Sequence, residues 1–224
     1  MEHHHIVSRF DKDIKRIESQ LTKMAELTIK QLESAIVAIE THDTELSQRI
    51  AKGDREINAL EARIDELAVR LIALRQPMAE DLRHVVSTLK ITTNIERIAD
   101  YAKTMALRVP VLANGDPVDS ATKTIRRMAE AVISMLRDAM TAFFERDLEL
   151  SSTTRERDLN IDQQDAALFR ELLTYMMENP RNIEAATHLL FISKNLERAG
   201  DQVCNITEHI CFLVTGEIFE NSDS

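Results

Sequence analysis

Two pairs of carboxylates recur at the same spacing in this chain. The heptapeptide N-I-E-R-I-A-D is followed, 101 residues later, by N-L-E-R-A-G-D. Each copy carries a Glu and an Asp four residues apart, namely Glu96 with Asp100 and Glu197 with Asp201. On a helix, residues at this spacing lie on one face, about one turn apart. Such a pair can supply oxygen ligands to a hard cation, or it can simply face the solvent.

Further polar residues follow the same duplication. At an offset of 104 residues, Asp54 and Asn58 of the first copy align with Asp158 and Asp162 of the second. A helical wheel places these four on the flank of an apolar seam, and it places the heptapeptide acids opposite the core. Because a flanking acid can meet an outward acid of a neighbouring helix, we expect an open, oxygen-rich patch on the outer surface of each bundle.

Oxygen-only ligands favour magnesium, calcium, manganese or iron, whereas zinc usually prefers His or Cys. A plain solvated face is the alternative, with Arg97 and Arg198 pairing with the acids along the helix. Like charges four residues apart are mildly destabilising, yet both copies carry them. Cys204 follows Asp201 by three residues and can reach a metal, although a buried thiol also explains it. On the residues alone, the metal site and the solvated face both remain open.

The duplication extends over most of the chain. Met24, Ala25 and Glu26 align with residues 128–130 at the 104-residue offset, which falls to 101 before Ile91. Three residues have therefore been lost from the second copy. A period near 100 is too long for a solenoid unit and indicates two tandem copies of a small domain.

Composition and periodicity predict an all-α protein. Gly, Pro and aromatic residues are few, and good helix formers dominate. Apolar residues spaced by threes and fours predict helices over 8–41, 43–75, 79–108, 118–146, 147–178 and 181–215. Asp43 is the expected N-cap of the second helix, and Gly216 the expected stop of the last.

Long helices with short links favour antiparallel neighbours, so we predict two tandem antiparallel three-helix bundles. The turn-rich segment 109–117 separates the first repeat, 8–108, from the second, 118–216.

The charge and hydropathy pattern excludes several classes of function. The net charge is −10 with no basic stripe, so neither nucleic acid nor an anionic membrane surface is an expected partner. No window approaches the roughly 18 apolar residues of a membrane span, and no signal segment opens the chain. We expect Cys204 and Cys211 to be reduced thiols of a cytoplasmic protein. The histidines at 3–5 are assigned no function.

Five strings in the chain together resemble the PhoU family, the phosphate-uptake regulators of bacteria. The similarity covers about residues 5–216. The strings are D-R-E-I-N (54–58), R-Q-P-M-A-E-D-L-R (75–83), N-I-E-R-I-A-D (94–100), T-Y-M-M-E-N-P-R (174–181) and N-L-E-R-A-G-D (195–201).

The resemblance implies two tandem three-helix bundles with clusters of iron, zinc or another divalent metal on their surfaces. Carried over to this sequence, the ligands are Glu96, Asp100, Asp54 and Asn58 in the first copy and Glu197, Asp201, Asp158 and Asp162 in the second. Asn58 replaces an acid, which implies a weaker first cluster. Ala99 replaces the usual Gly before the motif Asp, a departure expected to affect helix packing only.

By the same resemblance, the protein is a cytoplasmic negative regulator of the phosphate-starvation response. It would link the ATPase of the phosphate ABC transporter to the sensor histidine kinase when phosphate is plentiful. Exposed seams on the long helices also predict a homodimer, and no direct insertion into the membrane is expected.

Two other functions compete with this interpretation. A carboxylate-bridged metalloenzyme would need Glu-x-x-His pairs that project inward, and the two copies carry none at matched positions. There is also no Gly-rich phosphate loop and no duplicated His to act as general base. A metal-free helical scaffold predicts instead that Ala at Glu96, Asp100, Glu197 and Asp201 leaves partner binding intact.

Overall fold

The computed structural model describes residues 2–114 and 118–217, and all regular structure within these ranges is helical. The elements are α1 (Glu2–Thr41), α2 (Thr44–Arg75), α3 (Ala79–Ala106), α4 (Val109–Leu112), α5 (Asp119–Glu145), α6 (Leu148–Glu156), α7 (Asp158–Glu178), a 3-10 turn (Pro180–Asn182) and α8 (Ile183–Thr215). The all-α prediction is therefore confirmed.

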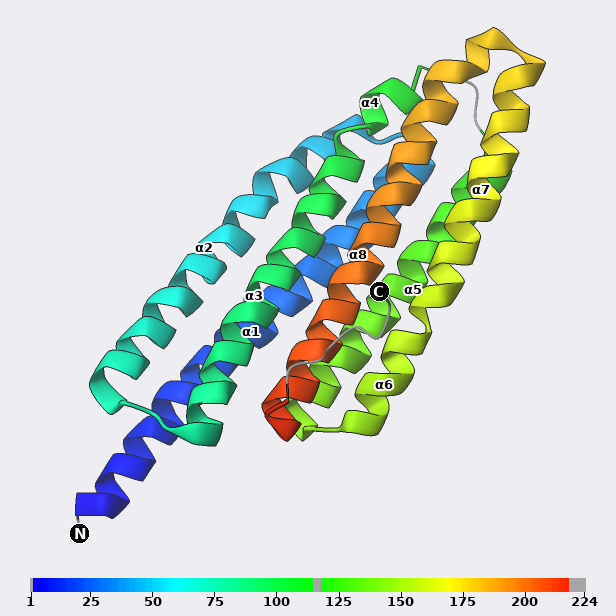
Figure 1. Cartoon of the computed structure of the whole chain (residues 1–224). Helices are drawn as coiled ribbons and strands as arrows, with labels where there is room; N and C mark the ends of the chain where they lie inside the picture. Colours follow the sequence, from blue (N-terminus) through cyan, green and yellow to red (C-terminus); the bar gives the residue numbers. More distant parts are fainter. Residues whose placement is uncertain (1, 115–117, 218–224) are drawn as a thin grey trace.

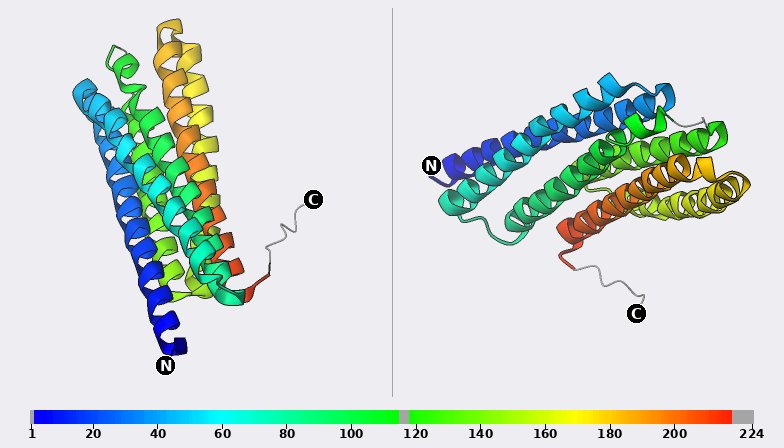
Figure 2. Two further views of the ribbon diagram at one scale, coloured as in Figure 1. Left: turned by 90° about the vertical axis from the view of Figure 1, so that its left-hand side faces the viewer. Right: turned by 90° about the horizontal axis from the view of Figure 1, so that it is seen from above.

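The helices form two antiparallel three-helix bundles that lie side by side (Figure 1). The first contains α1, α2 and α3, and the second contains α5, α8 and the pair α6 and α7, which together take the place of one helix. In the view from above, α2 and α7 lie toward opposite edges of the molecule (Figure 2). The predicted tandem bundles are thus present.

Contact between α3 and α8 joins the two bundles in the middle of the molecule (Figure 1). The two helices are antiparallel, since Arg83 near the start of α3 donates to the Leu213 carbonyl near the end of α8. At the other end, Arg108 lies 3.4 Å from the ring nitrogen of His188. Buried apolar side chains from both bundles form one continuous core.

Equivalent contacts fix the helix ends in the two repeats. Asp43 caps α2 by accepting from the Leu46 amide, as predicted, and Asp147 caps α6 through the Leu150 amide. The buried Ser47 hydroxyl donates to the Ala106 carbonyl at 2.6 Å, and Ser151 donates to the Thr207 carbonyl at 3.2 Å. Both sets of contacts occupy aligned positions, so the structure repeats as the sequence does. Gly216 ends α8 with a φ of 78°, as expected.

Three segments differ from the sequence prediction. The first helix begins at Glu2, whereas it was expected to begin near residue 8. The single helix expected over 147–178 is interrupted at Arg157, which separates α6 from α7. The Arg157 guanidinium bonds to Asp138 at 2.5 Å and to the Ser134 hydroxyl at 2.8 Å, both on α5. The predicted linker begins with the short helix α4, and its last three residues, 115–117, lie outside the described residues.

Across the described ranges, every helix is too short or too polar to cross a lipid bilayer.

Candidate carboxylate sites of the two repeats

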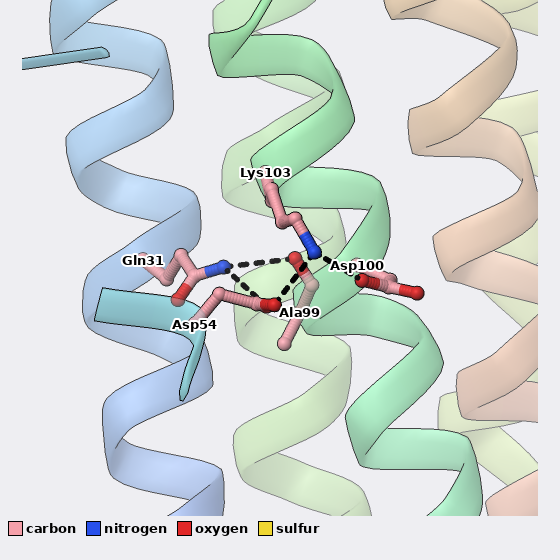
Figure 3. A network of polar contacts seen from close by, with 5 residues as sticks. All are labelled: Gln31, Asp54, Ala99, Asp100 and Lys103. Atoms are coloured by element: carbon pink, nitrogen blue, oxygen red, sulfur yellow. Dashed lines mark hydrogen bonds and ion pairs between the residues drawn. The ribbon is translucent and has the colours of Figure 1, made fainter. Parts of the chain in front are cut away.

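In the first repeat, a lysine joins the predicted acids (Figure 3). Asp54, only 3% exposed, accepts from Lys103 Nζ at 2.7 Å, and Asp100 Oδ1 lies 3.2 Å from the same nitrogen. Gln31 Nε2 donates to Asp54 Oδ1 at 3.3 Å and to the Ala99 carbonyl at 2.9 Å. The buried carboxylate of Asp54 is therefore both hydrogen-bonded and neutralised by groups of the protein itself.

The remaining acids of this repeat are electrostatically coupled. Burial, followed by repulsion from Asp100 and Glu61, raises the pKa of Glu96 to about 7. Burial also raises the pKa of Glu61, with repulsion from neighbouring acids adding to it. The hydrogen bond to Asp54 raises the pKa of Lys103, so its ammonium is held in the charged form. The first cluster is thus a set of acids organised around one internal cation.

In the second repeat, the four predicted acids also influence one another. Burial raises the pKa of Asp158 to about 6, and repulsion from Asp162 is the next largest cause. A hydrogen bond with the Cys204 thiol opposes this shift, while Asp201 and Glu197 add smaller repulsions. Burial likewise raises the pKa of Asp201, and Glu197 and Asp162 add to the shift. The fold therefore brings together residues that lie about 40 positions apart in the sequence.

Several oxygens of this second cluster lack hydrogen-bond partners. Asp158 Oδ1 and Glu197 Oε2 are both buried and unpartnered, although Glu197 Oε1 accepts from Lys194 at 2.6 Å. Gln202, 8% exposed, has an unpartnered Oε1 as well. Leaving such groups unpaired costs roughly 1–3 kcal/mol each. Oxygens of this kind are well suited to a bound cation.

A groove between α8 and the junction of α6 and α7 exposes part of this cluster. Its lining includes Asp158, Asp201, Gln202, Cys204 and Glu208. Gly200, beside them on α8, lets the two helices approach closely, because a Cβ there would lie 2.3 Å from Asp158 Oδ1. The first repeat has Ala99 at the aligned position. We infer that Asp54 lies farther from this position than Asp158 lies from Gly200.

Cys204 is half-buried and free, and Cys211 is also free. Burial, with the nearby Asp158 adding to it, raises the pKa of the Cys204 thiol well above its ordinary value. It is therefore protonated at neutral pH, as expected for a small buried thiol.

The expected open patch is only partly correct. Asn58, Asp162 and Asp201 are exposed, Glu96, Asp100, Asp158 and Glu197 are partly buried, and Asp54 is buried. The wheel assumed one core direction, but α3 and α8 pack against their own bundles and against each other, which buries a wider face of each.

Sequence reasoning also missed Gln31, Lys103 and Gln202. Lys103 had a detectable signal, because it aligns with Cys204 at the 101-residue offset and so marks a difference between the repeats.

Within residues 2–114 and 118–217, no three His, Cys, Asp or Glu side chains are arranged to hold a metal ion as they stand. The eight residues remain predicted ligands. The unpartnered oxygens of the second repeat fit a cation, whereas the ammonium of Lys103 already fills that role in the first.

Fold and site together define a class: internally duplicated helical proteins in which each three-helix repeat carries a carboxylate cluster. The PhoU domain model matches residues 21–109 and 125–210 of the chain. The chain therefore belongs to the PhoU family, as the sequence strings indicated.

Relatives match over nearly the whole chain. A protein of Caulobacter vibrioides named "phosphate-specific transport system accessory protein PhoU homolog" is 42% identical over 213 residues, 95% of this chain and 93% of its own. A homologue of the same name in Xylella fastidiosa is 41% identical and covers 96% of this chain and 88% of its own.

Solved structures agree with these matches. PhoU from Pseudomonas aeruginosa superposes with a TM-score of 0.88 at 34% identity, covering 93% of this chain and all of its own. The phosphate transport system regulatory protein PhoU from Streptococcus pneumoniae also gives 0.88, at 28% identity and 95% coverage.

Proposed function

We propose that this protein is a cytoplasmic accessory regulator of phosphate-specific transport that represses the phosphate-starvation response. In this role it docks on the ATPase of the phosphate transporter and on the sensor histidine kinase when phosphate is plentiful. The observation that carries the proposal is the match, over nearly the full length of both chains, to relatives named as accessory proteins of that transport system.

The acidic clusters are the proposed contact surface. The second cluster has exposed acids at Asp162 and Asp201, and Glu96 and Asp100 of the first are partly exposed. A surface of this charge suits a basic patch on a partner protein, and it steers association through long-range attraction.

A divalent metal, iron or zinc among the candidates, is proposed to bind in the second repeat. Asp158, Asp162, Glu197 and Asp201 would hold it, and the metal would supply positive charge that offsets their mutual repulsion. The support is the pair of buried, unpartnered oxygens on Asp158 and Glu197. A metal there would hold α7 and α8 in one relative position and so define the docking surface.

Partner binding tests the proposal directly. The purified protein should capture the transporter ATPase and the kinase, and changing Glu96, Asp100, Glu197 and Asp201 to Ala should weaken capture about tenfold or more if these acids form contacts. A matched control removes four exposed acids elsewhere, at Asp11, Glu26, Glu178 and Glu217. Equal capture by both variants would favour the metal-free scaffold that docks through another face.

A cellular reporter tests the direction of regulation. In a bacterium that lacks its own PhoU homologue, this chain should restore low expression of a phosphate-starvation promoter in phosphate-rich medium. The control variant should also restore it, whereas the cluster variant should not. Constant high expression with every version of the chain would contradict a repressing role.

A further inference from the structure

We propose that Lys103 is an internal counter-ion that closes the first repeat to metal, so that only the second repeat binds a divalent cation. The inference rests on the metal site proposed above, and it concerns a difference between two sites that duplication made equivalent. Lys103 thereby acts as a specificity-determining residue of this chain.

The two flanking carboxylates have different partners although they occupy aligned positions. Asp54 receives hydrogen bonds from Lys103 Nζ at 2.7 Å and from Gln31 Nε2 at 3.3 Å (Figure 3). At the positions that align with Lys103 and Gln31, the second repeat has Cys204 and Met135. Neither replacement provides an ammonium or an amide. The Cys204 thiol gives the Asp158 carboxyl a hydrogen bond without a positive charge, and Asp158 Oδ1 has no hydrogen-bond partner.

A third difference between the repeats is that Asp158 lies very close to helix α8. Gly200 provides the room, since any Cβ there would collide with Asp158 Oδ1, whereas Ala99 stands at the aligned position of the first repeat. In the first repeat, the Ala99 carbonyl accepts from Gln31 instead. All three differences thus separate a carboxylate that is paired with a lysine from one that has no lysine partner and keeps one oxygen without a hydrogen bond.

An ammonium and a metal cannot share the first site. A metal ion lies about 2.0–2.6 Å from its carboxylate oxygens. Since Lys103 Nζ is 2.7 Å from Asp54 Oδ2, a metal bound to that carboxylate would lie close to a fixed positive charge. Binding would require Lys103 to leave, with the loss of charge-assisted hydrogen bonds to Asp54 and Asp100.

The second repeat also contains, in the same groove, an amide oxygen without a hydrogen-bond partner. Gln202 is 8% exposed, its Oε1 has no hydrogen-bond partner, and it lines the groove beside Asp158 and Asp201. Two cations lie near this cluster. Lys194 pairs with Glu197 on the same helix, with about half of its side chain exposed, and it also lowers the pKa of Asp201. Arg155 lines the groove and pairs with Glu208 at 3.3 Å. No lysine in the described part of that repeat bridges two acids as Lys103 does.

Metal content of full-length variants tests the proposal. All proteins carry Ala at positions 3–5, because the histidines there can bind transition metals themselves. Each protein is equilibrated with zinc, or with iron(II) under anaerobic conditions, then dialysed and analysed by mass spectrometry. Circular dichroism verifies that helicity is kept.

Removing the ammonium should open the first site. Lys103→Met should roughly double the bound metal, and adding Asp54→Asn to it should return the content to the wild-type level. The matched control is Lys23→Met, which removes an exposed pair with Glu56 in the same bundle and should change nothing. An unchanged metal content in folded Lys103→Met would overturn the proposal.

The reciprocal change should close the second site without removing any acid. Cys204→Lys should lose the wild-type metal, whereas Cys204→Met should keep it. Full retention by Cys204→Lys, or loss of metal from Asp54→Asn alone, would contradict the assignment. Metal in Lys103→Met but none in the wild type would uphold the role of Lys103 and refute the proposed site in the second repeat.

Discussion

Asp158 carries an unfavourable charge in the metal-free protein. Its pKa of about 6 lies above the ordinary 3.8, so ionisation at neutral pH weakens the folded state. Asp158→Asn removes this penalty and should stabilise the metal-free protein by about 1 kcal/mol, after allowance for solvent screening. Urea unfolding in the presence of a chelator measures the change.

The control for this prediction is Asp11→Asn, which changes the net charge by the same amount but removes an exposed acid. The effect of Asp158→Asn on stability is expected only over a defined range of pH. The favourable contribution of the wild-type Asp158 is fully present below its unfolded pKa of 3.8 and is lost as the pH rises through about 6. A stabilisation that is equally large below pH 3.8 would mean that charge is not its cause.

The contribution of His209 to stability depends on pH in the opposite direction. Burial, with the nearby Lys90 adding to it, lowers its pKa from 6.5 to about 4. The neutral ring therefore contributes stability above pH 6.5 that is lost as the pH falls through 4, because the unfolded chain takes up the proton first. Relative to His209→Asn, the wild type should lose about 1–2 kcal/mol over this window, after allowance for partial exposure.

Urea titrations of both proteins at several pH values test this expectation. A constant difference between them across the window would show that His209 does not titrate differently in the folded and unfolded states. The raised pKa of Asp158 and the lowered pKa of His209 change the stability of the wild type in opposite directions with pH. The difference between the wild type and His209→Asn therefore isolates the contribution of His209, which the wild-type curve alone does not.

The sequence predicted the acids of the sites but not their partners. Duplication identified Glu96, Asp100, Glu197 and Asp201 because the two copies could be compared with each other. The role of Lys103 depends on the reach of its side chain across to α2, which no spacing along one helix reveals.

At the level of elements, aligned aspartates start the second helix of each repeat. Asp43 accepts from the Leu46 amide at 2.8 Å, and Asp147 accepts from the Leu150 amide at 2.9 Å. Each substitution by Ala should cost about 1 kcal/mol, since an amide of the first turn loses its partner. Urea unfolding of the single and double variants measures these costs.

The double variant should show the sum of the two losses, because the caps lie in different bundles and share no contact. Glu149→Ala is the control, as it removes an exposed acid from the first turn of α6 without touching the cap. A loss from the control equal to that of Asp147→Ala would assign the effect to helix-end charge and not to the hydrogen bond.

Helix positions were predicted within a few residues wherever apolar periodicity and capping residues agreed. The break at Arg157 was not predicted, because neither Gly nor Pro marks it and its cause is a tie to α5 through Asp138 and Ser134. The aligned position in α2 is Gly53, where the helix continues despite the weaker helix former. Tertiary contacts therefore outweighed local preference at both positions.

For the whole molecule, the shared core predicts a single cooperative unfolding transition. Buried side chains of α1, α2 and α3 are continuous with those of α5, α7 and α8. Tyr101 lies in the first repeat and Tyr175 in the second, and the chain has no Trp. In the variants Tyr175→Phe and Tyr101→Phe, the remaining tyrosine should therefore report the same urea midpoint from either bundle.

A core substitution in one bundle should lower both midpoints together. Leu21 is fully buried in α1, and Leu21→Ala should cost about 2–5 kcal/mol. Separate midpoints for the two tyrosines would show that the bundles unfold independently despite their contact.

The ion pair between Glu33 and Arg137 has a further consequence. These residues, 104 positions apart, are aligned with each other in the two repeats, so a position meets its own counterpart between α1 and α5. In an isologous dimer, a residue on the twofold axis meets the same residue of the other chain. Two identical chains would therefore place two like charges against each other at this position. Fusion into one polypeptide removes that restriction, because each half can then mutate alone. The two repeats therefore pack against each other as the chains of an isologous dimer do, and the same freedom permits Lys103 in one half and Cys204 in the other.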